Sequence, residues 1–154
     1  MSSDLEQLYQ QIILEHAKLR HGEGLVDPPE GTAKGESHQL NPTCGDEITL
    51  RAALDSAAEN GATVGGISWE GQGCSISMAS ASVVTGLAAG LPRDEVLGLV
   101  ENFREVMRSR GTVEADEEVL GDAAAFSGVS RYPARVKCAM LAWVALEEAV
   151  QTAQ

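Results

Sequence analysis

The dipeptide Asn60-Gly61 constrains the fold of this chain more than any other short segment. Asn-Gly fits a tight two-residue turn, and it is a strong hairpin signal when extended segments flank it. Apolar residues alternate with polar ones before the turn, and apolar residues resume after it. The sequence therefore predicts two antiparallel strands. Their core positions are Ile48, Leu50 and Ala52 before the turn, and Val64, Ile67 and Trp69 after it.

Helical periodicity lies on both sides of this extended region. One amphipathic helix is expected near the N-terminus, and further helices follow the hairpin. Strands that lie between helices, without regular alternation of the two, indicate an α+β fold whose antiparallel sheet is covered on one face. The length fits one domain, residues 1–154. The helices are expected at residues 4–20, 75–90 and 92–109, and from Pro133 onward.

Three other segments are assigned by composition as much as by periodicity. Residues 22–35 hold four glycines and the pair Pro28-Pro29, and they predict a loop. From Ser37 to Leu54 the pattern is extended. Residues 109–129 form an acidic, glycine-punctuated stretch with room for a short helix.

The charge balance limits the partners of the chain. Lys and Arg number 11 against 23 Asp and Glu, and the net charge of −12 repels nucleic-acid phosphates and anionic membrane surfaces. No charged-then-apolar leader opens the chain, and no run approaches the roughly 20 apolar residues of a membrane span. We therefore expect a cytoplasmic protein that binds neither nucleic acid nor membrane.

Three cysteines carry the expected chemistry. An odd number without a secretory leader argues against a disulfide framework and for reduced thiols that bind metal or react. Cys44 precedes one arm of the predicted hairpin and Cys74 follows the other, so the two thiols can converge. Cys138 lies on the second turn of the last helix. With Asp46 they make four candidate ligands for zinc, which is commonly tetrahedral and accepts thiolates and carboxylates.

Spacing alone does not decide between a metal site and inert thiols. No CxxC pair occurs, and free cysteines are often buried without any role. Position favours the metal site, because Cys44 and Cys74 are flanked by glycines at element ends, where an inert buried thiol has little reason to lie. Asp46 has the alternative role of starting or capping the hairpin.

Arg135 and Lys137 are candidates for a supporting charge. Three thiolates and one carboxylate around a divalent cation leave an excess of negative charge, and Arg135 lies one helical turn before Cys138. The alternative is that both cations are solvated surface residues. We favour the supporting role for Arg135, and less so for Lys137.

The remaining aromatic and imidazole side chains are assigned no chemistry. His16 is interpreted as a packing residue of the first helix. His21 and His38 are expected in loops and given no role. Trp69 and Trp143 are interpreted as core residues.

Three motifs resemble a known family. The segments "NPTCGD", "GQGCSIS" and "RYPARVKCAMLAW", in this order, are similar to the three cysteine motifs of the U-type iron-sulfur assembly proteins, and "LYQQIILEH" extends the similarity toward the N-terminus. The SufU branch fits better than the IscU scaffolds. Lys137 stands where IscU-type proteins have a histidine, and residues 109–129 match a SufU-type insertion. The chain departs from the family after the first helix, where "KLRHGEG" replaces an Asn-Pro-Arg segment.

This resemblance implies a SufE/NifU-like fold, with a small antiparallel three-stranded sheet covered by helices on one face. It implies a zinc site of Cys44, Asp46, Cys74 and Cys138, with Cys44 as sulfur acceptor. The implied partner is a SufS-type cysteine desulfurase that uses pyridoxal phosphate, with other Suf proteins as further partners. The chain would then be a sulfurtransferase-like partner of that enzyme and not a stand-alone enzyme.

Two other functions remain open. The first is a scaffold on which an iron-sulfur cluster is assembled and passed on, because thiolates bind iron as well as zinc. The second is a purely structural zinc module that binds a partner through its helices.

Overall fold

The computed structural model describes residues 2–42, 45–55 and 62–153. It has the expected α+β composition, with one helix, then strands, then further helices. In chain order the elements are α1 (Ser2–Leu19), β1 (Ala33–Asn41), β2 (Asp46–Asp55), β3 (Thr63–Gln72), α2 (Ser75–Ala88), α3 (Arg93–Arg108), α4 (Glu117–Leu120), the 3-10 helix η1 (Gly121–Arg131) and α5 (Pro133–Thr152).

The strands form one antiparallel sheet in the order β1-β2-β3. Asn41, the last residue of β1, pairs with Asp46, the first residue of β2. The predicted antiparallel pairing of β2 with β3 is confirmed. The Asn60-Gly61 turn on which that prediction rested lies outside the described residues.

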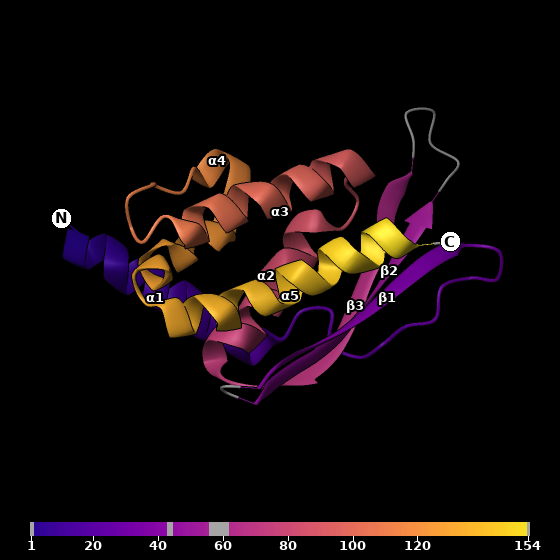
Figure 1. The fold of residues 1–154 in the computed structure, drawn as a ribbon, viewed down its shortest axis with the longest axis horizontal. Coiled ribbons are helices and arrows are strands. Elements are labelled where there is room, and N and C mark those ends of the chain that lie inside the picture. Colours follow the sequence, from indigo (N-terminus) through magenta and orange to yellow (C-terminus); the bar gives the residue numbers. More distant parts are fainter. Residues whose placement is uncertain (1, 43–44, 56–61, 154) are drawn as a thin grey trace.

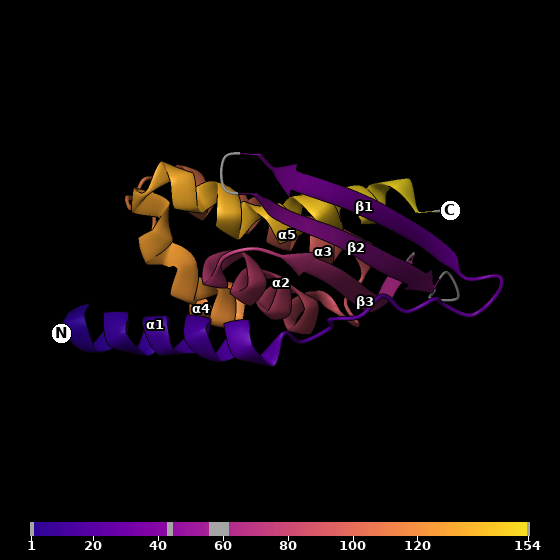
Figure 2. The ribbon, with the colours of Figure 1, turned by 90° about the horizontal axis from the view of Figure 1, so that it is seen from below.

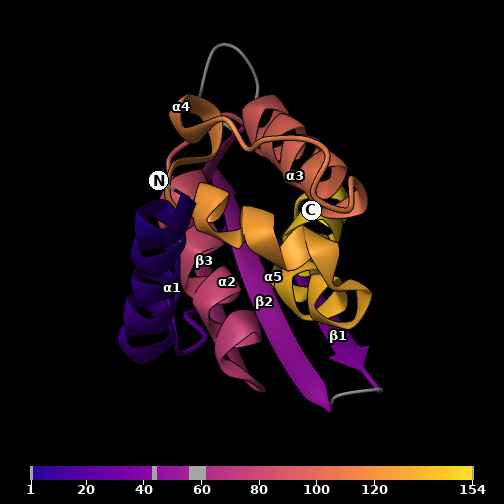
Figure 3. The same ribbon diagram turned by 90° about the vertical axis from the view of Figure 1, so that its left-hand side faces the viewer.

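Helices cover one face of the sheet, as expected. In Figure 1, α5 lies across β1 and β2. Figure 2 shows α1 running along the outer side of α2, and Figure 3 shows α1, α2 and α5 side by side. Within the described residues, no helix combines the length and the apolar character needed to cross a membrane.

The core lies between the sheet and the helices. Trp143 of α5 is fully buried and stacks on Phe103 of α3, with the ring centroids 4.0 Å apart. Its indole N–H donates to the Ser80 hydroxyl of α2 at 2.9 Å, so its polar group is satisfied. Trp69 of β3 is also fully buried, and the interpretation of both tryptophans as core residues is confirmed. The apolar positions that alternate along β2 are all buried: Ile48, Leu50, Ala52 and Leu54.

The sequence prediction was wrong about β1. This strand begins at Ala33, inside the predicted loop, and His38 lies in it and not in a loop. Most residues of β1 that alternate with the buried ones are charged or polar and exposed, such as Lys34 and Glu36, although Leu40 is exposed as well. An edge strand of this kind lacks the apolar alternation that reveals a strand in a sequence. The extended pattern from Ser37 to Leu54 covers the end of β1 and most of β2, and the expected three-stranded antiparallel sheet is confirmed.

The acidic segment 109–129 ends in α4 and η1. A 3-10 helix has about three residues per turn, so its sequence shows no α-helical period. Asp122 of η1 accepts a hydrogen bond from His16 of α1, with Nε2 2.9 Å from Oδ2. The other ring nitrogen of His16 lies 2.8 Å from the Ser82 hydroxyl of α2. His16 thus fastens α1 to two elements, which agrees with its interpretation as a packing residue.

A close approach between helix and sheet occurs at Gly35 of β1. A Cβ at this position would lie 1.7 Å from the carbonyl oxygen of Ala149 and 3.1 Å from the backbone nitrogen of Ala153, both in the C-terminal part of the chain. Backbone atoms cannot move aside as the tip of a flexible side chain can. The C-terminal part of α5 therefore rests on β1 only because residue 35 has no side chain.

Replacing Gly35 should destabilise the protein. We expect Gly35→Ala to lower the free energy of unfolding by about 1–3 kcal/mol or more, because the added methyl group overpacks a backbone contact. Gly66→Ala in β3 is the matched control, since a Cβ there meets no atom within 4 Å. Urea unfolding of both variants measures the difference. Equal stability of the two variants would contradict the close packing of α5 on β1.

Candidate metal centre

Three of the four predicted ligands converge at one end of the sheet. Asp46 is the first residue of β2, Cys74 directly precedes α2, and Cys138 lies in the second turn of α5. The starts of these three elements meet at the same end of the molecule in Figure 1. One ligand atom from each residue lies within 4.8 Å of the other two.

The Asp46 carboxylate is buried and held by the start of α2. Asp46 is only 1% exposed to solvent. Oδ1 accepts the backbone N–H of Cys74 at 3.1 Å, and Oδ2 accepts the Ser77 hydroxyl at 2.5 Å. Oδ2 also lies 3.7 Å from the Cys74 sulfur. Asp46 therefore begins an arm of the hairpin, as the alternative interpretation held, and its carboxylate also bonds to the start of α2 and faces the thiols.

Hydrogen bonds keep this carboxylate ionised. Burial alone raises the pKa of Asp46, because it disfavours the charged form. Hydrogen bonds from the side chains of Cys138 and Ser77 and from Cys74 act in the opposite direction and prevail, so the pKa of Asp46 lies below its ordinary value. The group is thus an anion at neutral pH, as metal binding requires.

Glycines allow β3 and the start of α2 to approach Asp46. A Cβ on Gly73 would lie 2.5 Å from Oδ1 and 2.9 Å from Cγ of Asp46. A Cβ on Gly71 would lie 2.4 Å from the carbonyl oxygen of Glu47. The two glycines that precede Cys74 are therefore required for the convergence of the ligands.

The two thiols differ in exposure. Cys138 is buried, and its sulfur lies 3.7 Å from the carbonyl oxygen of Ala134, one turn earlier in α5. Cys74 is exposed and occupies the N-cap position of α2 without a side-chain capping bond. The pair thus combines a buried anchor with a thiol at the surface.

These residues fit a divalent metal such as zinc. Zinc-sulfur bonds of about 2.3 Å and zinc-oxygen bonds of about 2.0–2.2 Å place tetrahedral ligands roughly 3.5–3.8 Å apart. Oδ2 of Asp46 and the sulfur of Cys74 are 3.7 Å apart, within that range, and one ligand atom from each of the three residues lies within 4.8 Å of the other two. Thiolate with carboxylate is a donor set that zinc accepts.

Comparison with known proteins identifies the family. Residues 8–139 match the NifU-like N terminal domain, which covers most of the chain. The chain belongs to this family.

Members of the NifU-like N-terminal family resemble the chain over nearly its whole length. It is 39% identical over 150 residues to the zinc-dependent sulfurtransferase SufU of Bacillus subtilis, covering 97% of this chain and 93% of the relative. It is 36% identical to an iron-sulfur cluster assembly scaffold protein IscU of Streptococcus pyogenes, covering 97% and 86%. The fold matches a crystal structure of a putative iron-sulfur cluster assembly scaffold protein for the SUF system from Fervidobacterium islandicum. The TM-score is 0.73 and the identity 33%, covering 90% of this chain and 93% of that one.

The family membership leaves the individual roles of Cys44 and Arg135 as predictions. Cys44 lies outside the described residues. Arg135 is exposed at the start of α5, and its guanidinium carbon lies 5.2 Å from the centroid of the Tyr132 ring. Lys137 is exposed beside Cys138. The structure thus places Arg135 in a cation-π contact one turn before Cys138, and a supporting charge remains its expected role.

Sequence reasoning missed the contact between Ser77 and Asp46. The serine was one of several in a small-residue helix, and nothing in its local sequence singled it out. The available signal was its spacing, since a residue three positions after Cys74 lies about one helical turn away on the same side of α2.

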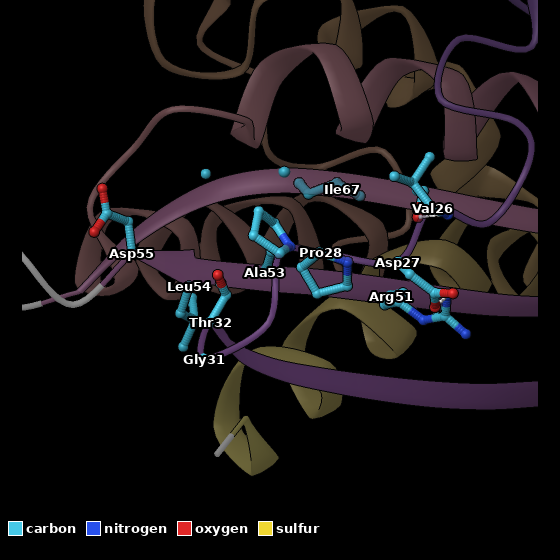
Figure 4. A pocket seen from close by; sticks show the side chains of 14 residues that line it. Val26, Asp27, Pro28, Gly31, Thr32, Arg51, Ala53, Leu54, Asp55 and Ile67 are labelled. Atoms are coloured by element: carbon cyan, nitrogen blue, oxygen red, sulfur yellow. Dashed lines mark hydrogen bonds and ion pairs between the residues drawn. The ribbon is translucent and has the colours of Figure 1, made fainter.

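A separate hollow of about 620 Å³ lies on the other face of the sheet, between the loop after α1 and the later parts of β2 and β3. Figure 4 shows Pro28 and Val26 above it and Arg51 at its rim. The Arg51 guanidinium is engaged by Asp27 at 2.8 Å and by Glu36 at 2.7 Å. None of the three described ligands, Asp46, Cys74 and Cys138, lines this hollow.

Replacing Gly73 should disturb the metal centre more than the fold. We expect Gly73→Ala to displace the Asp46 carboxylate and to weaken zinc binding roughly 10-fold or more, the range seen when partners of metal ligands are altered. Zinc affinity is measured by competition with a chromophoric chelator. Gly98→Ala in α3 is the control, because a Cβ there meets no atom within 4 Å. Unchanged zinc affinity in Gly73→Ala would show that the close approach does not matter for the site.

Proposed function

We propose that the protein is a zinc-dependent sulfur acceptor that takes persulfide sulfur from a cysteine desulfurase for iron-sulfur cluster biogenesis. The observation that carries this proposal is the convergence of a buried carboxylate and two thiols in a chain of the NifU-like N-terminal family. The SufU of Bacillus subtilis, to which the chain is 39% identical, is named as a zinc-dependent sulfurtransferase.

We assign Cys44 as the fourth ligand, with Asp46, Cys74 and Cys138. Only one residue separates Cys44 from Asp46 in the sequence, and Asp46 pairs with Asn41 across the start of the sheet. Zinc sites with a functional role keep one position open to exchange, whereas structural sites are closed. A ligand between two strand ends suits exchange better than one within a helix.

Sulfur transfer requires a thiolate at Cys44. A bound zinc ion would hold the coordinated thiols deprotonated at neutral pH. The Cys44 sulfur attacks the outer sulfur of the persulfide on the donor cysteine. A new S–S bond forms at Cys44, the S–S bond of the donor breaks, and its electron pair leaves with the donor thiolate. The exchange is redox-neutral, so it needs no oxidant.

The other site residues then hold the centre in place. Cys74 and Cys138 belong to the starts of two packed helices and are suited to anchoring a metal. Four anionic ligands exceed the charge of one divalent ion, and we propose that Arg135 offsets part of this excess from its position one turn before Cys138. Its contact with Tyr132 supports this proposal, because the ring restrains the guanidinium near the start of α5.

The proposed partner is a desulfurase of the SufS type, with other Suf proteins as further partners. A protein with a net charge of −12 would meet a basic docking face most readily. We place the protein in the cytoplasm, where thiols stay reduced and can accept sulfur.

The second candidate function is a scaffold for iron-sulfur cluster assembly. Two observations favour it: the IscU of Streptococcus pyogenes is 36% identical, and cysteine thiolates are the ordinary ligands of such clusters. Lys137 favours the sulfur-acceptor function. By the resemblance described above, the IscU-type scaffolds carry a histidine directly before the third cysteine, whereas this chain has Lys137 at that position. A closed structural zinc module, the third possibility, has no use for a ligand between strand ends.

Metal content and desulfurase stimulation separate these functions. We expect the purified protein to carry about one zinc per chain, to lack a visible chromophore and to accelerate cysteine turnover by a SufS-type desulfurase. Removal of zinc with a chelator should abolish the acceleration and lower the melting temperature, because bound metal stabilises the folded state. Iron with a visible chromophore and no acceleration would favour the scaffold instead. Zinc without acceleration would favour the structural module.

Replacing single cysteines tests the acceptor. After incubation with the desulfurase and cysteine, the Cys44→Ser protein should show no mass gain of one sulfur atom, whereas the wild-type protein gains it at the Cys44 peptide. Cys74→Ser and Cys138→Ser should lose mainly zinc affinity, since both residues are anchors. Mass spectrometry and zinc competition measure the two effects. Full sulfur acceptance by Cys44→Ser, with loss in Cys74→Ser, would move the acceptor role to Cys74.

A further inference from the structure

One buried hydroxyl faces the ligands of the proposed metal centre. Ser77 lies in the first turn of α2 and is 2% exposed. Its Oγ lies 2.5 Å from Oδ2 of Asp46 and 3.6 Å from the sulfur of Cys74. The hydroxyl thus contacts two proposed ligands at once.

Capping of α2 does not account for this hydroxyl. The backbone N–H of Cys74, at the start of the helix, is already bound by Oδ1 of Asp46. Other buried serines of α2 have partners outside the centre: Ser80 donates to the carbonyl oxygen of Ala139, and Ser82 lies against His16. Ser77 differs from both because its partners are ligands.

Two hydrogen bonds from one helical turn fix both oxygens of the carboxylate. The bond from Cys74 N–H holds Oδ1, and the bond from the Ser77 hydroxyl holds Oδ2 on the side of the thiols. Without the second bond the carboxylate could rotate about its last torsion, because that torsion is broad for aspartate. The hydroxyl therefore helps the Cys74 N–H to determine which oxygen faces the sulfur atoms.

The Ser77 hydroxyl also lies between the Asp46 carboxylate, to which it donates, and the Cys74 sulfur. A bound divalent metal would hold the thiol of Cys74 as a thiolate, and a hydrogen bond to an ionised group is stronger than one between neutral groups. Partners of this kind orient metal ligands and contribute to affinity in many metal sites.

We propose that Ser77 is a positioning residue of the metal centre, which holds Oδ2 of Asp46 toward Cys74 and Cys138 and so raises the affinity for zinc. This inference rests on the proposed function only in that the centre binds a divalent metal. It does not depend on sulfur transfer.

Zinc affinity of the full chain tests the proposal. Ser77→Ala should bind zinc about 10–100-fold more weakly than wild type, measured with a chromophoric competitor. Ser75→Ala, at an exposed position of the same turn, should bind like wild type. Cobalt(II) provides a spectroscopic readout: its d–d bands should shift in Ser77→Ala while the thiolate charge-transfer bands remain, because both thiols are retained. Equal affinity and equal spectra of Ser77→Ala and wild type would overturn the proposal.

A matched pair covers the case in which Ser77→Ala does not fold. Ser77→Thr and Ser77→Val have nearly the same shape, and only threonine keeps the hydroxyl. The Ser77→Thr variant should bind zinc about 10–100-fold more tightly than the Ser77→Val variant, and equal affinities would contradict the inference.

Combining Ser77→Ala with Asp46→Ala tests whether Ser77 affects zinc affinity through Asp46. Ser77→Ala should add little to the loss in Asp46→Ala, and an undiminished further loss would show that Ser77 does not act through Asp46.

Wild-type binding separates this inference from the proposed function. If wild type takes up neither zinc nor cobalt, the metal centre itself is wrong, and the role of Ser77 falls with it. If wild type and Ser77→Ala bind zinc equally, the role of Ser77 is wrong while the proposed function stands.

Discussion

The hydrogen bonds between the Asp46 carboxylate and the first turn of α2 join the sheet to the helices at the end where the ligands meet. A buried carboxylate without partners would be destabilising, so these bonds stabilise the fold as well as the site. Cys74 contributes its backbone N–H to this contact and its sulfur to the proposed ligand set. Any change that separates β2 from α2 therefore disrupts the carboxylate and the ligand cluster together.

Close backbone packing makes this junction possible. Gly71 and Gly73 bring the end of β3 against the start of β2, and Gly35 brings β1 against α5. Since α2 and α5 pack side by side, these contacts also fix the relative positions of Cys74 and Cys138. Glycines in this chain therefore determine helix placement, which in turn determines how close the thiols lie.

Much of this arrangement could be predicted from the sequence, and the failures have physical causes. The alternation along β2 and the helical spacing of the later segments depend on burial, which leaves a pattern in the sequence. β1 left no such pattern, because its exposed face is mostly polar and its buried face includes Gly35 and Ser37. η1 turns about every three residues, so the α-helical spacing rules do not find it. Ser77 left only the weak signal of its spacing from Cys74, because its partner Asp46 is distant in the sequence and their contact exists only in the folded chain.

The proposed ligands come from segments that are distant in the sequence, so the order of folding and metal binding differs from that of a zinc finger. In a zinc finger, neighbouring cysteines can bind the metal before the chain has folded, and the metal then drives folding. Here Asp46, Cys74 and Cys138 come from a strand and two helices that meet only after the sheet and the helical layer have packed. The buried core of this chain, which includes Trp69 and Trp143, contributes to that packing. Because three of the proposed ligands are placed by packed strands and helices, the centre would tolerate the temporary loss of a fourth, and sulfur transfer at Cys44 would require that tolerance.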